Sequence, residues 1–375
     1  MARPTTATID LDAIRHNYRL AKQLAGASRA LAVVKADAYG HGAVKVCQAL
    51  VNEADGFAVA AIEEAIELRE AGITSPILLL EGFFEANELS LIEHYNLSFV
   101  VHNSFQLESL AGYNGPAMFN VWLKIDIGMH RLGIPLNQAL NALGQLLALR
   151  SVKDVVLMAH FACADELDNP ITAEQLQLFL KTVNGRGLPL SLSNSAAILG
   201  WPQTHHAWIR PGLMLYGATP FETAQAQADR LKPAMHLNTE VIAVRTLTEG
   251  ETVGYGASWR AERPSRIGTL AIGYADGYPR QMRSGAPILI EGQRTNIVGR
   301  VSMDMITVDL TDLPKATIGS SAELFGAALT AAELAPWANT IPYTLFTGIT
   351  RRVHKVYAGA ALNHKGAHDP NQAGS

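Results

Sequence analysis

The feature that most constrains the fold is an alternation, over residues 10–220, between short apolar runs and stretches with helical periodicity. The runs are rich in Val, Ile, Leu and Phe, which is typical of strands buried on both faces of a parallel sheet. Between them, stretches such as 62–72 and 172–184 space their apolar residues as a helix does. Eight such strands predict a (β/α)8 TIM barrel, an α/β fold, with a doubly wound open sheet as the alternative. The runs span 30–34, 56–60, 76–80, 98–101, 119–125, 155–159, 190–192 and 208–209.

The pattern changes after about Leu231, where strand-like runs follow one another with turn signals and few helical segments between them. This pattern is typical of a mostly β domain. We therefore predict a barrel over residues 1–230, a C-terminal β domain over 231–358 and a flexible tail over 359–375, which has few large apolar residues. The β runs span 239–244, 252–255, 266–272, 288–290, 295–298, 306–310 and 321–324.

Composition excludes several classes of function. Hydrophobic residues make up 48% of the 375 residues, enough for a large core, and the net charge of −4 gives no reason to expect nucleic acid. No apolar stretch approaches the roughly 20 residues that span a membrane, and the N-terminus has no apolar signal segment. The two cysteines, Cys47 and Cys163, show no metal-ligand spacing. We expect a cytoplasmic protein that acts on a small molecule and binds no metal.

Several polar residues follow the predicted barrel strands, where a barrel carries its chemistry. Any one of them has an ordinary explanation: Lys35 could reach solvent, and Ser195 could cap the next helix. Together they place a lysine, a histidine, two arginines and helix-capping serines on one rim. The residues are Lys35, Tyr39, Lys124, Arg131, His160, Ser193, Asn194, Ser195 and Arg210.

The polar residues on this rim suit a site that binds phosphate. A serine at a helix N-terminus and the turn at Gly212 supply the backbone N–H groups that bind phosphate. A buried lysine such as Lys35 can become an amine nucleophile. A phosphate site beside such a lysine indicates a phosphorylated aldehyde cofactor held as a Schiff base, although an aldolase acting on a phosphosugar has the same features.

Eight segments resemble motifs of alanine racemase, in the same order and with similar spacing over about residues 5–357. The resemblance implies a pyridoxal 5′-phosphate enzyme with an N-terminal barrel and a C-terminal β domain. It also implies a head-to-tail homodimer in which the partner's C-terminal domain completes each active site. The segments are 32–42, 131–133, 160–165, 193–195, 210–217, 254–256, 272–278 and 298–304.

The resemblance implies a two-base mechanism on the aldimine that alanine forms with the cofactor. Lys35 matches the Schiff-base lysine, which also serves as the base for D-alanine. Tyr255 matches the opposite base, which acts on L-alanine from the other subunit. Two bases on opposite faces of Cα can remove a proton from one side and return it on the other. The family supplies D-alanine for peptidoglycan or degrades it.

The remaining roles are also carried over from the resemblance. Arg131 and the backbone N–H of Met303 match the contacts to the substrate carboxylate, and Tyr274 and Asp304 match residues that narrow the entrance. Lys124 matches a lysine that is often carbamylated in the family, with direct pairing to Asp126 as the alternative. Arg210 matches the residue that faces the pyridine nitrogen, and His160 links it to the opposite base. The cofactor phosphate is matched by Tyr39, Ser195, Gly212, Leu213 and Tyr343.

Two positions depart from the family pattern: Ile127 stands where threonine is common, and Thr344 where glutamate is common. Ile127 lacks a hydroxyl near Lys124 and Arg131, and Thr344 lacks a carboxylate behind the phosphate site. Three other functions share parts of this pattern: a broad-specificity amino-acid racemase of the same fold, a non-catalytic pyridoxal-phosphate protein and a pyridoxal-phosphate decarboxylase. The β domain and the match around Tyr255 argue against the last two.

Overall fold

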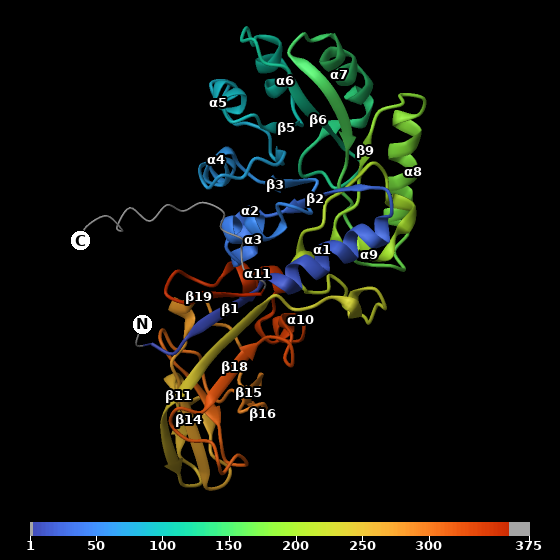
Figure 1. The fold of residues 1–375 in the computed structure, drawn as a ribbon. Coiled ribbons are helices and arrows are strands. Elements are labelled where there is room, and N and C mark those ends of the chain that lie inside the picture. The colour runs from blue at the N-terminus through green and yellow to red at the C-terminus, as the bar shows by residue number, and fades with distance from the viewer. Residues whose placement is uncertain (1–2, 360–375) are drawn as a thin grey trace, which may run out of the picture.

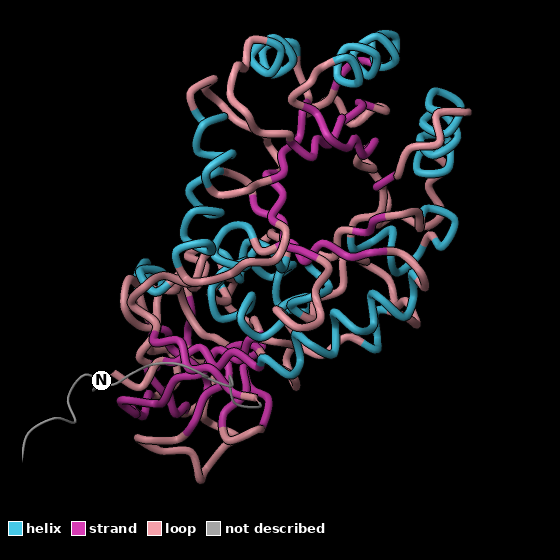
Figure 2. The backbone as a smooth tube through the Cα atoms, turned by 45° about the horizontal axis from the view of Figure 1, so that its top comes forward, coloured by secondary structure: helices cyan, strands magenta, loops and turns pink. Residues whose placement is uncertain are grey.

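The computed structural model describes residues 3–359, which form a barrel joined to a β-rich domain (Figure 1). The barrel is a closed ring of eight parallel strands, because β5 pairs with β6 and β10 pairs with β2. Figure 2 shows the ring with helices outside it. The barrel prediction is confirmed, and the open-sheet alternative is wrong. The ring comprises β2 (Arg29–Val33), β3 (Gly56–Val59), β4 (Ile77–Leu79), β5 (Ser98–Val101), β6 (Phe119–Asp126), β8 (Val152–Met158), β9 (Leu190–Ser191) and β10 (Trp208–Ile209).

The first helix of the barrel, α1 (Leu11–Ala25), begins after a capping residue. This residue is Asp10, whose carboxylate accepts the N–H groups of Asp12 and Ala13 and so caps the helix. A two-residue strand, β7 (Ile134–Pro135), extends the edge of β6. The other helices are α2 (Lys35–Gly40), α3 (Ala43–Leu50), α4 (Ile62–Glu70), α5 (Glu88–His94), α6 (Ser104–Ala111), α7 (Leu136–Ala148), α8 (Ile171–Val183) and α9 (Ser195–Gly200).

The second domain is built around β11 (Met235–Leu247), which pairs with three antiparallel neighbours. One neighbour comes from the other end of the chain: β1 (Thr6–Asp10) lies between β11 and β19 (His354–Ala358). The mostly β prediction is confirmed. The other elements are β12 (Thr252–Val253), β13 (Trp259–Arg260), β14 (Ser265–Leu270), β15 (Pro287–Ile290), β16 (Gln293–Asn296), β17 (Ile306–Asp309), β18 (Ser321–Phe325), α10 (Ala331–Leu334) and α11 (Pro342–Thr347).

Short 3-10 turns carry several of the residues discussed below: η1 (Pro202–Thr204), η2 (Leu213–Tyr216), η3 (Ala228–Arg230), η4 (Tyr255–Ala257), η5 (Tyr274–Asp276) and η6 (Ala335–Ala338). The division of the chain at 230/231 stays a prediction, and β1 crosses it by joining the second sheet. Residues 360–375 of the predicted tail lie outside the described residues. Within the described part, no helix is both long and apolar enough to cross a bilayer.

Candidate active site

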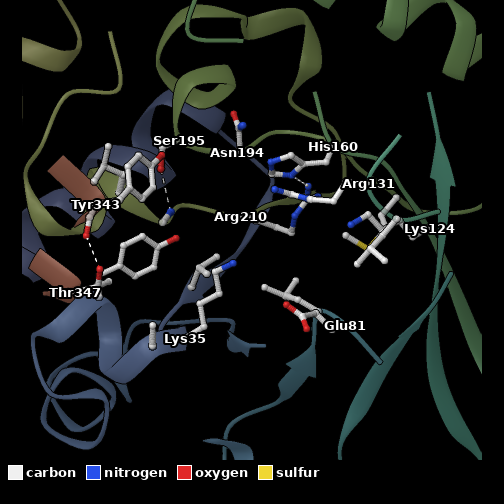
Figure 3. A pocket seen from close by; sticks show the side chains of 18 residues that line it. Lys35, Glu81, Lys124, Arg131, His160, Asn194, Ser195, Arg210, Tyr343 and Thr347 are labelled. Carbon is white, nitrogen blue, oxygen red and sulfur yellow. Dashed lines mark hydrogen bonds between the residues drawn. The ribbon is translucent and has the colours of Figure 1, made fainter. Parts of the chain in front are cut away.

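A cavity of about 690 Å³ opens at the carboxyl ends of the barrel strands (Figure 3). Lys35 reaches it from the segment after β2, while Tyr343 and Thr347 reach it from α11 of the second domain. Ten residues predicted from the sequence line this one space. They are Lys35, Tyr39, Lys124, Arg131, His160, Ser195, Arg210, Gly212, Leu213 and Tyr343.

The backbone after Lys35 adopts a left-handed conformation that L-residues rarely take. Ala36 to Tyr39 have φ of 52–53°, a left-handed turn that costs roughly 1–2 kcal/mol per residue. Neighbours hold it in place: Ala36 N donates to Glu64 Oε1 at 2.6 Å, and Asp37 Oδ2 accepts from Lys355 Nζ at 2.6 Å. Because Lys355 lies on β19, the second domain helps to stabilise the turn that carries Tyr39 into the cavity.

His41 completes the support of this turn. Its Nδ1 lies 3.1 Å from Ala38 O and 2.9 Å from Tyr39 O, so Nδ1 carries the proton and donates. The ring is fully buried against Tyr216 and Phe346, with ring centroids 4.4 and 5.1 Å away. Burial lowers the pKa of His41 to about 4, so the ring is neutral at pH 7.

The phosphate end of the cavity is a cradle of donors. Ser195 Oγ accepts the N–H groups of Gly212 at 3.0 Å and Met214 at 3.2 Å, which leaves its own proton free to donate. A Cβ at position 212 would lie 2.8 Å from Tyr39 Oη, so glycine keeps this space open. Burial raises the pKa of Tyr343 to about 12 and also raises the pKa of Tyr39. Both phenols therefore stay protonated and can donate to an anion.

Arg210 and His160 form a linked pair. Arg210 is 4% exposed and donates to Ser191 Oγ at 2.6 Å and Ala159 O at 2.8 Å rather than to a carboxylate. Burial lowers its pKa to about 10, which still leaves it charged at neutral pH. Its Nη2 lies 3.5 Å from His160 Nδ1, which must accept, so the imidazole proton sits on Nε2. Burial and the Arg210 charge lower the pKa of His160 well below its ordinary value and keep the ring neutral.

Lys124 is 8% exposed on β6. Burial, reinforced by the nearby Arg210 charge, lowers its pKa to about 8. The alternative that Lys124 pairs with Asp126 is wrong, because the Asp126 carboxylate turns to its own loop. It accepts from Gly128 N at 3.0 Å and lies 2.9 Å from His130 Nδ1. Lys124 therefore presents an amine that is partly neutral near pH 8.

Four predicted residues lie outside this cavity. Tyr255, Met303 and Tyr274 are 69%, 52% and 38% exposed on turns of the second domain, and Asp304 is also exposed. The structure of one chain does not bring them together with Lys35. The two departures from the family pattern also differ in place, since Ile127 is buried and Thr344 is exposed.

Sequence reasoning missed two polar residues of the cavity, Glu81 and Thr347, and gave Asn194 no role beyond the rim. Glu81 is the second residue after β4, so the rule used for the other strand ends could have found it. Asn194 caps α9 by accepting from Ala197 N, and Thr347 Oγ1 donates to Tyr343 O at 2.9 Å. Thr347 had no sequence signal, because it comes from the second domain.

The donor cradle, the space at Gly212 and the lysine that lines the cavity, Lys35, suit a phosphorylated aldehyde held through an amine. A barrel with this site and an added β domain defines a pyridoxal-phosphate-dependent enzyme.

The comparisons name the family. A family model for the alanine racemase N-terminal domain matches residues 9–220, and one for the C-terminal domain matches 234–357. The chain is 56% identical over 357 residues to the alanine racemase of Pseudomonas taetrolens, covering 95% of this chain and 99% of that one. A catabolic alanine racemase of Pseudomonas putida gives the same identity and coverage. The chain therefore belongs to the alanine racemase family and is an isomerase that interconverts L- and D-alanine.

Solved structures agree. The biosynthetic alanine racemase of Pseudomonas aeruginosa superposes with a TM-score of 0.93 at 48% identity, covering 95% of this chain and all of that one. The enzyme of Bartonella henselae, solved with covalently bound pyridoxal phosphate, gives a TM-score of 0.86 at 29% identity, with 95% and 99% covered. Pyridoxal phosphate is the cofactor. The aldolase, non-catalytic and decarboxylase alternatives are wrong.

Proposed function

We propose that Lys35 and Tyr255 are the two acid–base groups of alanine racemisation, and that Tyr255 acts in the cavity of a second copy of the chain. The proposal is supported chiefly by the separation of the two groups. Lys35 lines the cavity, whereas Tyr255 is 69% exposed on the second domain. A general base needs hydrogen-bond reach of the proton that it removes. A head-to-tail homodimer gives Tyr255 that reach.

The cofactor is held by groups that donate to an anion. Ser195, Tyr39, Tyr343 and the backbone of Gly212 and Leu213 bind its phosphate, as the protonated phenols and the open space at Gly212 support. When bound, pyridoxal phosphate withdraws electrons from the substrate Cα and so makes its proton acidic.

Arg210 faces the pyridine nitrogen of the cofactor. Its pKa of about 10 means that it cannot act as a proton donor to a weakly basic nitrogen at neutral pH, which limits electron withdrawal and discourages transamination. His160, with its proton on Nε2, links Arg210 to Tyr255 of the partner subunit. A nearby guanidinium and an N–H donor favour the phenolate form that a tyrosine base requires.

Arg131 and the backbone N–H of Met303 bind the substrate carboxylate. Arg131 lines the cavity and carries the positive charge that a carboxylate requires. Lys124 is carbamylated, a role supported by burial and by a pKa of about 8, since only a neutral amine captures carbon dioxide. The carbamate would then orient Arg131. Tyr274 and Asp304 narrow the entrance and favour alanine over larger amino acids.

The cytoplasmic location stays a prediction. It is supported by Cys47 and Cys163, both free thiols in the structure, which suit a reducing compartment.

Deuterium exchange tests the two bases separately. Tyr255→Phe in deuterium oxide should exchange the Cα proton of D-alanine through Lys35 without racemising it, and should leave L-alanine unlabelled. Tyr95→Phe, which alters a tyrosine that does not line the cavity, is the control and should racemise and label both enantiomers. Racemisation by Tyr255→Phe at the wild-type rate would rule out the assignment.

A further inference from the structure

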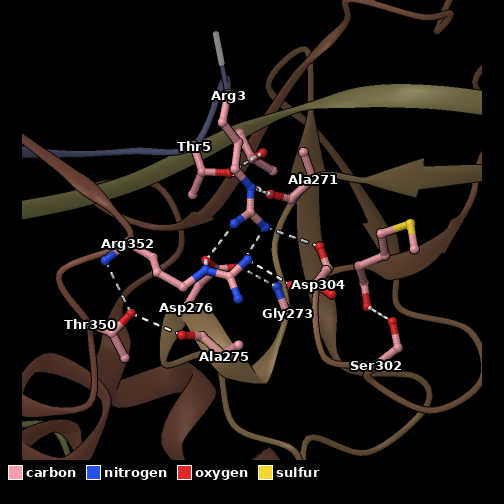
Figure 4. Close-up of polar contacts among 12 residues, drawn as sticks. Arg3, Thr5, Ala271, Gly273, Ala275, Asp276, Ser302, Asp304, Thr350 and Arg352 are labelled. Atoms are coloured by element: carbon pink, nitrogen blue, oxygen red, sulfur yellow. Dashed lines mark hydrogen bonds and ion pairs between the residues drawn. The ribbon is translucent and has the colours of Figure 1, made fainter. Parts of the chain in front are cut away.

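A buried carboxylate, Asp276, lies at the centre of a charged cluster in the second domain (Figure 4). Arg3 approaches it as a two-pronged donor, with Nη1–Oδ1 at 2.8 Å and Nη2–Oδ2 at 2.7 Å. Arg352 Nε lies 3.2 Å from Oδ1, and Gly273 N donates to Oδ2 at 2.9 Å. Asp276 is fully buried, so two guanidinium groups and an N–H compensate the desolvation of its charge.

The cluster joins three distant parts of the chain. Arg3 precedes β1, Asp276 ends η5, and Arg352 precedes β19. Arg3 Nη2 also donates to Asp304 O at 3.2 Å, and Arg352 Nη2 lies 2.6 Å from Asp304 Oδ1. Both arginines therefore bind the loop that contains Met303 as well as the buried carboxylate.

Backbone hydrogen bonds connect η5, the turn that ends at Asp276, to the loop that contains Met303. Tyr274 N donates to Ser302 O at 3.0 Å, and Ala275 N donates to Met303 O at 2.9 Å. The two loops approach so closely at Gly273 that a Cβ there would lie 2.4 Å from Met303 O. A shift of η5 would therefore move Met303 directly.

Met303 itself presents an unused donor. Its carbonyl is engaged by Ala275, whereas its N–H donates to no group in residues 3–359. The residue is 52% exposed, and hydrogen bonds hold its carbonyl and its neighbour Asp304 in place. A donor fixed in this way loses little freedom when a ligand binds, which favours affinity.

We propose that Asp276 is a positioning residue which, with Arg3 and Arg352, fixes the backbone N–H of Met303 for the substrate carboxylate in the cavity of the partner subunit. This inference rests on the proposed function, in which Met303 acts across a dimer. Arg3, Asp276 and Arg352 do not line the cavity of their own chain, so the cluster would act on the substrate through the loop of Met303 and not on the cofactor held by the same chain.

Asp276→Asn tests the inference, since the amide keeps the shape but removes the charge that both arginines bind. We expect the KM for L- and D-alanine to rise about tenfold, because small misplacements of a binding group have effects of that order or larger. We expect kcat and the affinity of the holoenzyme for pyridoxal phosphate to stay near wild type. Asp312→Asn is the matched control: it removes an Asp–Arg pair of the same domain, with Arg263, that is exposed.

An unchanged KM in folded Asp276→Asn would overturn the inference, and so would a fall in kcat and cofactor affinity that parallels the rise in KM. If Asp276→Asn does not fold, Arg3→Ala replaces it as the test, because this variant removes one guanidinium and leaves Arg352 in place. We expect a smaller rise in KM in the same direction. An unchanged KM in Arg3→Ala would overturn the inference. Tyr255→Phe is assayed alongside. Full activity there contradicts the proposed function, whereas an inactive Tyr255→Phe with wild-type KM in Asp276→Asn contradicts only the role of the cluster.

Discussion

In the barrel cavity, Ser195 and Arg210 are buried and already bonded to neighbouring groups, whereas Tyr255 and Met303 lie on exposed turns of the second domain. The first region is ordered within one chain and can bind a cofactor there. The second region presents an exposed phenol, Tyr255, and the N–H of Met303, which donates to no group in residues 3–359. The difference is what the proposed function requires: one chain suffices to bind the cofactor, whereas racemisation needs Tyr255 and Met303 of a second chain.

Substitution of the two bases should separate the regions most strongly. Lys35→Ala should abolish racemisation and the absorbance of the lysine-bound cofactor, because the tether lies in the cavity. Tyr255→Phe should lower racemisation about a thousandfold, within the range for loss of a general base, but keep that absorbance. Absorbance spectra and polarimetry on both variants measure this. Loss of cofactor absorbance in Tyr255→Phe would contradict the separation.

The stability of the chain should depend on pH through His41, which supports the turn after Lys35. The unfolded chain protonates this histidine near pH 6.5, but the folded chain does so only near pH 4, so stability falls as pH drops through that window. Between pH 7 and pH 5 this loss is about 2 kcal/mol. His41→Asn keeps a donor at the Nδ1 position and should lose less stability over the same range.

Urea unfolding of wild type and His41→Asn at both pH values provides the measurement. The other buried histidines are present in both proteins, so the difference between the two pH responses isolates His41. Identical responses would show that His41 does not stay neutral in the folded chain.

Loss of one phosphate donor should have a smaller effect, confined to the cofactor. Ser195→Ala should weaken pyridoxal phosphate binding about tenfold, because it removes one hydrogen bond to a charged group. At saturating cofactor, racemisation should stay near wild type. Equilibrium titration of apoenzyme measures the affinity, and Ser90→Ala, on the exposed face of α5, is the control. An unchanged affinity in Ser195→Ala would remove Ser195 from the phosphate site.

Removal of carbon dioxide is expected to have the smallest effect on activity. With a pKa of about 8, Lys124 is partly neutral at pH 8, so isotopically labelled bicarbonate should give a carbamate signal that Lys124→Met lacks. Removal of carbon dioxide should lower kcat/KM a few-fold as Arg131 loses its orienting anion. A wild-type spectrum without the labelled carbamate would contradict the proposal for Lys124.

The barrel could be predicted from sequence because its strands are buried on both faces and read as continuous apolar runs. Most cavity residues were then found by position, since they lie at or after the end of a barrel strand, whereas Tyr343 on α11 came only from the family resemblance. The left-handed turn at Ala36 to Tyr39 could not be predicted, because these residues favour right-handed backbone and the turn is held by contacts from Glu64, Lys355 and His41.

Contacts between segments far apart in the sequence could not be predicted either. The short strand β1 was read as part of the barrel region, yet it pairs with β11 and β19 more than two hundred residues away. Asp276 gave no signal either, because an aspartate beside a glycine usually indicates a turn. Its two arginines come from opposite ends of the chain, so only the fold brings the cluster together.

The most direct test of the shared site is complementation between two inactive chains. Lys35→Ala and Tyr255→Phe, each inactive alone, are unfolded and refolded together so that mixed dimers form. A mixed dimer has one site with both defects and one with neither, so random mixing should restore about a quarter of wild-type activity. Mixed dimers that are verified by tag and remain inactive would contradict a site shared between two chains.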